Sequence, residues 1–178
     1  MRVGRPAGPL AGTLLLPAGP GPRPAVLLLP GSGPLDRDSD ARRAPLGITR
    51  SLAEALAAAG IASYRYDKRG VGASPGDWRR PGLWDGADDA RAALRQLAAR
   101  PEVHQGRLVL VGHSEGAILA AAVAADSDIP LGGVVLLSPT ARRGEDVLVW
   151  QAQQVGPTLP APVRTLLRVL RTDLVAAV

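Results

Sequence analysis

The sequence predicts an α/β fold with a mostly parallel sheet and helices on both faces. Apolar runs rich in Val and Leu recur along the chain, and they are continuous rather than alternating, as in strands whose two faces are both covered. Stretches with helical patterns separate these runs, and right-handed crossovers between them make the strands parallel. At 178 residues, the chain is long enough to bury one sizeable core.

The expected elements alternate between strand and helix after an initial pair of strands. Gly60 is placed to end one helix, and in another the acidic residues precede the basic ones, which suits the helix dipole. Strands are expected at residues 11–16, 24–30, 61–66, 108–112 and 131–137, and helices at residues 46–59, 85–100, from about 115, 147–150 and 162–178.

Composition excludes several classes of function. The net charge is +5, but the arginines are dispersed, Lys68 is the one lysine, and no nucleic-acid-binding motif is present, so we expect no nucleic-acid partner. The chain has no Cys and two His, which argues against a disulfide framework, a metal site or a cofactor held by such ligands. No run of 18 apolar residues predicts a membrane span, and no signal peptide is evident, so a cytoplasmic location is expected.

The motif that carries the chemistry is Gly112-His113-Ser114-Glu115-Gly116, between an apolar run and an alanine-rich run. This is the G-x-S-x-G pattern, in which flanking glycines allow a strand to turn sharply into a helix with an exposed serine hydroxyl. The alternative is a strand–turn–helix corner in which the serine only caps the helix. The flanking strand and helix favour the nucleophile elbow.

Two further stretches accompany this motif: LPGSGPLDRD at residues 29–38 and YDKRGVGAS at residues 66–74. With these three stretches in this order, the chain resembles the α/β-hydrolase family over about residues 12–140, in the esterase-like branch grouped with serine aminopeptidases. The resemblance implies that Ser114 attacks a carbonyl and that the backbone N–H of Glu115 holds the oxyanion. The second N–H is assigned to Ser32, with Gly33 as the alternative donor, although this loop also fits a plain tight turn.

Charged residues in the two accompanying stretches are expected to serve the structure. Asp67 and Arg69 are predicted to pair within their loop rather than to act on a substrate. Asp36 and Asp38 are predicted to order the loop in which they lie, and the alternative is that they shape the substrate entrance.

The catalytic base is the missing part. In this family the acid and then the histidine follow the serine, but His104 and His113 both precede Ser114. Acidic residues do follow, and Asp146 is the best candidate for the triad acid among Asp126, Asp128, Glu145, Asp146 and Asp173. We therefore expect Ser114 to lack an activating base within these 178 residues.

The sequence is thus interpreted as a serine hydrolase that cleaves an ester, thioester or amide through Ser114 and that lacks its C-terminal part. Residues 1–140 are predicted to form the core, and residues 141–178 a helical segment that begins a lid or cap region. The expected partner is a small ester or acyl substrate. The alternatives are a non-catalytic scaffold that binds a small apolar ligand or a protein partner, and a split enzyme whose complementing C-terminal half supplies the histidine.

Overall fold

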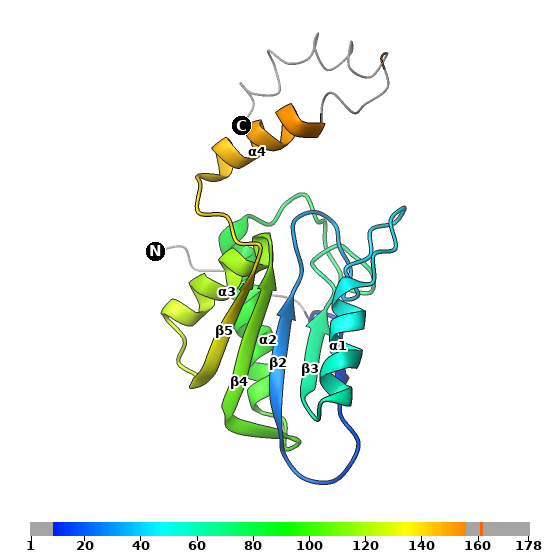
Figure 1. Ribbon diagram of the computed structural model, residues 1–178, viewed down its shortest axis with the longest axis vertical. Helices are drawn as coiled ribbons and strands as arrows, with labels where there is room; N and C mark the ends of the chain where they lie inside the picture. Colours follow the sequence, from blue (N-terminus) through cyan, green and yellow to red (C-terminus); the bar gives the residue numbers. More distant parts are fainter. Residues whose placement is uncertain (1–8, 156–160, 162–178) are drawn as a thin grey trace. The chain divides into compact units, whose positions relative to one another are not determined.

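The computed structural model describes residues 9–155 and residue 161. The chain divides into two compact units, Met1–Pro139 and Thr140–Val178 (Figure 1). The first unit holds the whole sheet, and the second contains helix α4 (Gly144–Val155). The predicted helix at residues 162–178 lies outside the described residues.

The sheet of the first unit has five strands in the order β1-β3-β2-β4-β5. Strand β1 runs antiparallel to β3, and all other neighbouring strands are parallel, which confirms the predicted fold class. The parallel strands β2 and β4 therefore end at the same edge of the sheet, where their following loops meet. The strands are β1 (Gly12–Leu15), β2 (Arg23–Leu29), β3 (Ala62–Tyr66), β4 (Val103–His113) and β5 (Leu131–Leu137).

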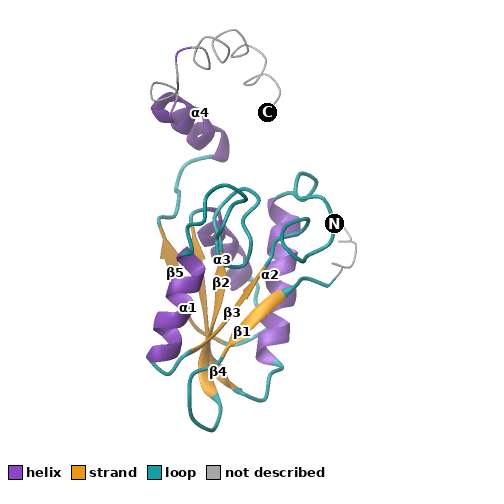
Figure 2. Ribbon diagram, turned by 90° about the vertical axis from the view of Figure 1, so that its right-hand side faces the viewer, coloured by secondary structure: helices purple, strands orange, loops and turns teal. Residues whose placement is uncertain are grey.

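Helices cover both faces of this sheet, as predicted. Helix α1 (Ile48–Ala58) lies on one face, whereas α2 (Leu83–Ala98) and α3 (Glu115–Ala125) lie on the other (Figure 2). The residues of β2 alternate between the two: Leu27 packs in the core beneath α2 and α3, and Leu28 packs in the core beneath α1. Both leucines are fully buried, which explains why β2 is apolar at every position of its central run.

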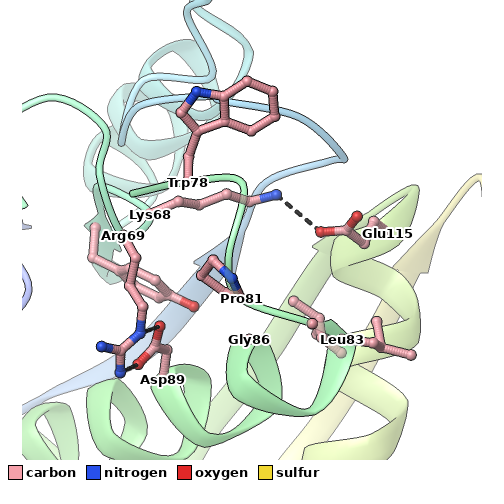
Figure 3. A pocket seen from close by; sticks show the side chains of 11 residues that line it. Lys68, Arg69, Trp78, Pro81, Leu83, Gly86, Asp89 and Glu115 are labelled. Atoms are coloured by element: carbon pink, nitrogen blue, oxygen red, sulfur yellow. Dashed lines mark hydrogen bonds and ion pairs between the residues drawn. The ribbon is translucent and has the colours of Figure 1, made fainter. Parts of the chain in front are cut away.

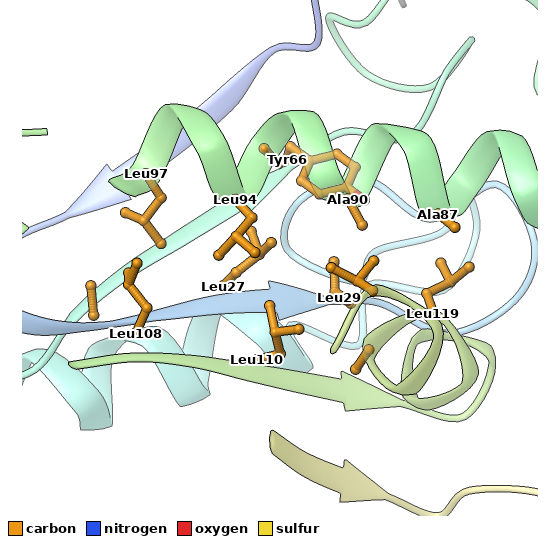
Figure 4. Packing of buried hydrophobic residues seen from close by; sticks show 14 of the residues in the cluster. Leu27, Leu29, Tyr66, Ala87, Ala90, Leu94, Leu97, Leu108, Leu110 and Leu119 are labelled. Atoms are coloured by element: carbon orange, nitrogen blue, oxygen red, sulfur yellow. The ribbon is translucent and has the colours of Figure 1, made fainter. Parts of the chain in front are cut away.

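The larger core lies between the sheet and the helices α2 and α3. Leu27 and Leu29 of β2 face Ala90 and Leu94 of α2 (Figure 4). Alanine on the inner side of α2 lets the helix lie close to the strands, and leucine fills the remaining space. With no Phe in the chain, aliphatic side chains make most of this interior, and Tyr66 is a buried aromatic residue within it.

Strand β4 differs in extent from the expectation, whereas β5 lies at the predicted residues 131–137 but is more exposed than its apolar run suggests. Strand β4 begins at Val103, earlier than predicted, because a register shift opposite Arg23 and a positive φ of 84° at Gly106 carry the pairing through a polar stretch. Strand β5 is the edge of the sheet, and its last four residues, Val134 to Leu137, are each 38–43% exposed. Its continuous apolar run is therefore open on both faces in this structure.

Candidate active site

Ser114 makes the turn between β4 and α3 alone. Strand β4 ends at His113 and helix α3 begins at Glu115, so one residue reverses the direction of the chain. The backbone angles of Ser114 are φ 55° and ψ −116°, a region that side-chain-bearing residues rarely adopt, at a cost of about 1–3 kcal/mol. Its backbone N–H donates to the carbonyl of Leu137 at 2.9 Å, which holds the strained turn against the end of β5.

The two glycines of the motif are required by close backbone packing. A Cβ atom at Gly116 would overlap the backbone oxygens of Leu29 and Pro30, at the end of β2. A Cβ atom at Gly112 would overlap the backbone of Gly116 itself. The first turn of α3 therefore lies directly on the end of β2, and this contact is possible only with glycine at both positions.

The loop after β2 lies beside the serine. A Cβ atom at Gly31 would be 3.5 Å from the Cβ of Ser114, so the peptide that joins Gly31 to Ser32 is next to the proposed nucleophile. Among the hydrogen bonds of the described residues, the backbone N–H groups of Ser32 and Glu115 have no acceptor. The structure thus brings together the three residues assigned from the sequence, while their catalytic roles stay predictions.

Neither histidine is hydrogen-bonded to Ser114 within the described part of the chain. His104 is exposed near the start of β4, and its Nδ1 lies 2.6 Å from the carbonyl oxygen of Gln105. The extended strand from Leu108 to Ser114 alone separates it from the serine by about 20 Å at ~3.3 Å per residue. The ring of His113 packs on the loop after β2, where its Nδ1 would be 3.4 Å from a Cβ at Gly31.

The predicted pairing of Asp67 with Arg69 is wrong. Asp67 instead binds Arg37, whose Nε and Nη2 donate to its two carboxylate oxygens at 3.0 and 2.7 Å. Burial alone would raise the pKa of Asp67, but hydrogen bonds from Arg37 and from the backbone N–H of Ala73 lower it below its usual value. This contact ties the loop after β2 to the loop after β3 across 30 residues of sequence.

Arg69 also pairs outside its loop. Its guanidinium binds Asp89 of α2 in a bidentate pair with distances of 2.7 and 2.6 Å. Burial raises the pKa of Asp89, and Arg69 offsets only part of that effect. Asp67 and Arg69 therefore each form an ion pair, as expected, but with partners that are distant in sequence, Arg37 and Asp89.

Asp36 orders its own loop by accepting from the N–H of Asp38 at 2.9 Å. The carboxylate of Asp38 instead joins this loop to other elements, because it accepts from Arg65 of β3 and Arg50 of α1 at 2.7 and 3.0 Å.

Lys68 is a site residue that the sequence reasoning missed. Its Nζ donates to the carbonyl oxygen of Gly31 at 2.6 Å. It also donates to Oε1 of Glu115 at 2.9 Å (Figure 3). One ammonium group thus contacts both the loop after β2 and the residue that follows Ser114. The sequence feature that could have drawn attention to this residue is composition, since Lys68 is the one lysine among 21 basic residues.

A cavity of about 140 Å³ lies beside this lysine. Apolar side chains from the segment before α2 and from α3 form part of its wall, together with Tyr66, whose pKa is raised by burial. Charged groups in the wall are already paired, Lys68 with Glu115 and Arg69 with Asp89 (Figure 3). The cavity is therefore suited to a small and mainly uncharged group.

The remaining acidic candidates do not meet Ser114 within the first unit. Asp126 and Asp128 form exposed ion pairs with Arg91 and Arg95 of α2. Asp146 lies in α4 of the second unit, and Asp173 lies outside the described residues. In the part of the chain that the structure describes, no cluster of three potential metal ligands is found, and no helix has the length and apolarity needed to cross a bilayer.

Comparison with known proteins agrees with this geometry. Residues 46–175 match the model of the family described as "Serine aminopeptidase, S33". Esterase EstD of Thermotoga maritima is 35% identical over 139 residues, which are 78% of this chain and 32% of EstD.

Solved structures show the same fold at lower identity. Est1E from Butyrivibrio proteoclasticus, solved with ferulic acid bound, has a TM-score of 0.60 and 24% identity, and the match covers 73% of this chain and 49% of Est1E. The Pyrococcus furiosus esterase Pf2001 has a TM-score of 0.62 and 20% identity, covering 84% of this chain and 55% of Pf2001.

The chain therefore spans about a third of the length of EstD and about half of each of these two structures. The fold, the family match over most of the chain and the identity to EstD point to one assignment. The chain belongs to the serine aminopeptidase S33 family of α/β-hydrolases.

Proposed function

We propose that this protein is a serine hydrolase that cleaves a small carboxylic ester by acyl transfer through Ser114. The observation that carries the proposal is the strained Ser114 turn, at φ 55° and ψ −116°, with α3 packed on the end of β2 through Gly112 and Gly116. A serine hydroxyl on such a turn is exposed above the sheet at the start of a helix, which suits attack on a carbonyl carbon. The esterase name of EstD supports an ester as the substrate.

In this proposal, the Oγ of Ser114 bonds to the carbonyl carbon, and the carbonyl oxygen becomes an oxyanion. The backbone N–H groups of Glu115 and Ser32 donate to that oxygen; in enzymes of this type, removing one such donor costs about 10²–10³ in turnover. The alcohol leaves with a proton, and water then releases the acid from the acyl-enzyme. No cofactor is needed for any of these steps.

The reaction also needs a base for the Ser114 proton. The chain has only His104 and His113, and neither is hydrogen-bonded to Ser114 in the described residues. The proposal therefore assigns the base to a histidine from outside these 178 residues, in a further part of the protein or in another chain. Without it, we expect this chain to turn over esters very slowly, since loss of such a base can cost about 10⁶ in turnover.

Covalent labelling tests the proposal. The chain is incubated with a small alkyl fluorophosphonate in increasing concentrations of imidazole, which acts as a diffusible base, and labelled peptides are identified by mass spectrometry. We expect labelling at Ser114 at a rate that rises with imidazole, and none in Ser114→Ala. Ser51, which is exposed on α1, provides the control: Ser51→Ala is expected to leave the labelling unchanged.

The second candidate function is a non-catalytic scaffold that binds a small, mainly uncharged ligand. The absence of a histidine bonded to Ser114 in the described residues and the cavity of about 140 Å³ favour it. No labelling of Ser114 at any imidazole concentration, or equal labelling of Ser51, would reject the hydrolase proposal. Saturable binding of an uncharged ester in that case would support the scaffold.

A further inference from the structure

We propose that Lys68 is a positioning residue that holds the proposed oxyanion hole in its working orientation. The inference rests on the proposed function, because it concerns the same Ser114 site. It starts from the two contacts of the Lys68 ammonium, 2.6 Å to the carbonyl oxygen of Gly31 and 2.9 Å to Oε1 of Glu115. Its side chain is only 20% exposed, so these contacts are made largely away from solvent.

The contact with Gly31 acts through the geometry of the peptide group. The carbonyl of Gly31 and the N–H of Ser32 belong to one planar, trans peptide, and they point in opposite directions. Lys68 holds the oxygen and so fixes the direction in which the Ser32 N–H points, on the side of the peptide away from the ammonium. This N–H has no acceptor among the described residues and is the donor that the proposed function needs.

Gly31 makes such a constraint necessary. A residue without Cβ has wide freedom in φ and ψ, so the peptide after Gly31 can rotate without the steric cost that a side chain would impose. Gly33, two residues on, has a positive φ of 85°, so the loop contains a second flexible position. In the flipped orientation the carbonyl oxygen, rather than the N–H, would point to the developing oxyanion, and the hole would repel it.

The contact with Glu115 couples the second donor to the first. Glu115 begins α3, and its own backbone N–H is the other donor assigned to the oxyanion. Figure 3 shows the Lys68 ammonium directed at the Glu115 carboxylate. One charged group on the loop after β3 therefore ties together the loop after β2 and the first residue of the elbow helix.

A lysine suits this place better than an arginine. An ammonium is a compact donor with three N–H bonds that point in different directions, whereas a guanidinium donates in one plane and prefers a carboxylate fork. The neighbouring Arg69 makes such a bidentate pair with Asp89 and contacts neither Gly31 nor Glu115 through a hydrogen bond in the described residues. The two adjacent cations thus have separate contacts. Arg91 of α2 provides the matched control, because it is also a paired cation, its side chain is 21% exposed, and it does not line the cavity.

The experiment compares Lys68→Met and Arg91→Met in the full 178-residue chain by ¹⁵N NMR and by the rate of Ser114 labelling with imidazole present. In Lys68→Met, we expect the Ser32 amide signal to shift or split and the labelling rate to fall by about 10–10³-fold. In Arg91→Met, which loses the ion pairs with Asp88 and Asp126, we expect lower thermal stability but an unchanged Ser32 signal and labelling rate. Lys68→Arg, which keeps a cationic donor, is expected to restore part of the labelling rate.

The Ser32 amide signal and the Ser114 labelling rate distinguish a failure of the role of Lys68 from a failure of the proposed hydrolase function. If the wild-type chain is not labelled at all, the proposed hydrolase function fails, and the Ser32 signal alone still decides the role of Lys68. The same Ser32 signal in wild type and Lys68→Met would overturn the inference. Equal losses of labelling in Lys68→Met and Arg91→Met, in proportion to their losses of stability, would overturn it as well. If Lys68→Met does not fold, Lys68→Gln, which is shorter and uncharged, is compared with the wild type instead, and an unchanged Ser32 signal would reject the inference.

Discussion

Replacement of Gly116 by alanine is the sharpest test of how the elbow is packed. The added Cβ would overlap the backbone oxygen of Leu29 and would lie 2.6 Å from that of Pro30, whereas ordinary contact begins at 3.4 Å. Neither oxygen is at the end of a flexible side chain, so α3 and β2 must separate by about an ångström or more to reach ordinary contact. Overpacking of this kind costs about 1–3 kcal/mol, which corresponds to a fall in Tm of roughly 2–12 °C for a chain of this size.

Gly86→Ala is the matched control, because Gly86 is also helical and its Cβ would meet only Leu119, at an ordinary 3.5 Å. We expect this variant to be more stable than the wild type by about 0.5–1 kcal/mol, the usual gain from removing a helical glycine. Urea denaturation followed by circular dichroism gives both free energies of unfolding. If the two variants have the same stability, or if Gly116→Ala equals the wild type, the close packing of α3 on β2 is refuted.

Three further outcomes are expected. Asp67→Asn should lower the free energy of unfolding by about 1.5–3 kcal/mol at neutral pH, because Arg37 loses a charged acceptor. The folded state lowers the pKa of Asp67, so its contribution is complete above the unfolded value of about 3.9 and is lost as pH falls through the lower folded value. Urea titrations at several pH values should therefore show the difference from the wild type narrowing below about pH 4, and a constant difference would contradict this. Ser114→Gly should stabilise the chain by about 1 kcal/mol, since relief of the strained turn exceeds the entropy cost of glycine; a lower Tm in differential scanning calorimetry would argue against strain. We expect the chain to self-associate through the exposed edge strand β5, and Val135→Lys, at a position that is 43% exposed, should reduce this association in size-exclusion chromatography. Unchanged association would mean that another surface is responsible.

The sequence was sufficient for the fold because its signals were local. The apolar run of β2, the alanine-rich run of α3 and the glycine that ends α1 each identify an element from neighbouring residues alone. The elbow was equally local, since the positions of Gly112 and Gly116 relative to Ser114 reflect one tight turn. The start of β4 was missed because Val103, which pairs with Arg23 of β2, is separated from the apolar run by residues 104–107, which form no apolar pattern and lie in the register shift.

The ion pairs could not be predicted in the same way. Arg37 and Asp67 are 30 residues apart, and Arg69 and Asp89 are 20 apart, so their pairing depends on how loops from different strands meet. Sequence proximity suggested the wrong partner for both Asp67 and Arg69. The role of Lys68 was hidden for the same reason, because both of its acceptors lie on other elements, 37 and 47 residues away.

The pairing of β2 with β4 has a consequence for the precision of the site. The loop that carries Ser32 leaves the end of β2, and Ser114 follows the end of β4, where Leu29 lies opposite Gly112 in the ladder. The register of these two strands therefore sets the relative position of the two loops. A slip of one residue between the strands would displace one loop from the other by about 3.3 Å, more than the length of a hydrogen bond. Such a slip would also turn the buried leucines of β2 to the wrong face. The same hydrophobic packing that makes the chain fold therefore sets the distance between the two halves of the proposed oxyanion hole, far more finely than the loops do by themselves.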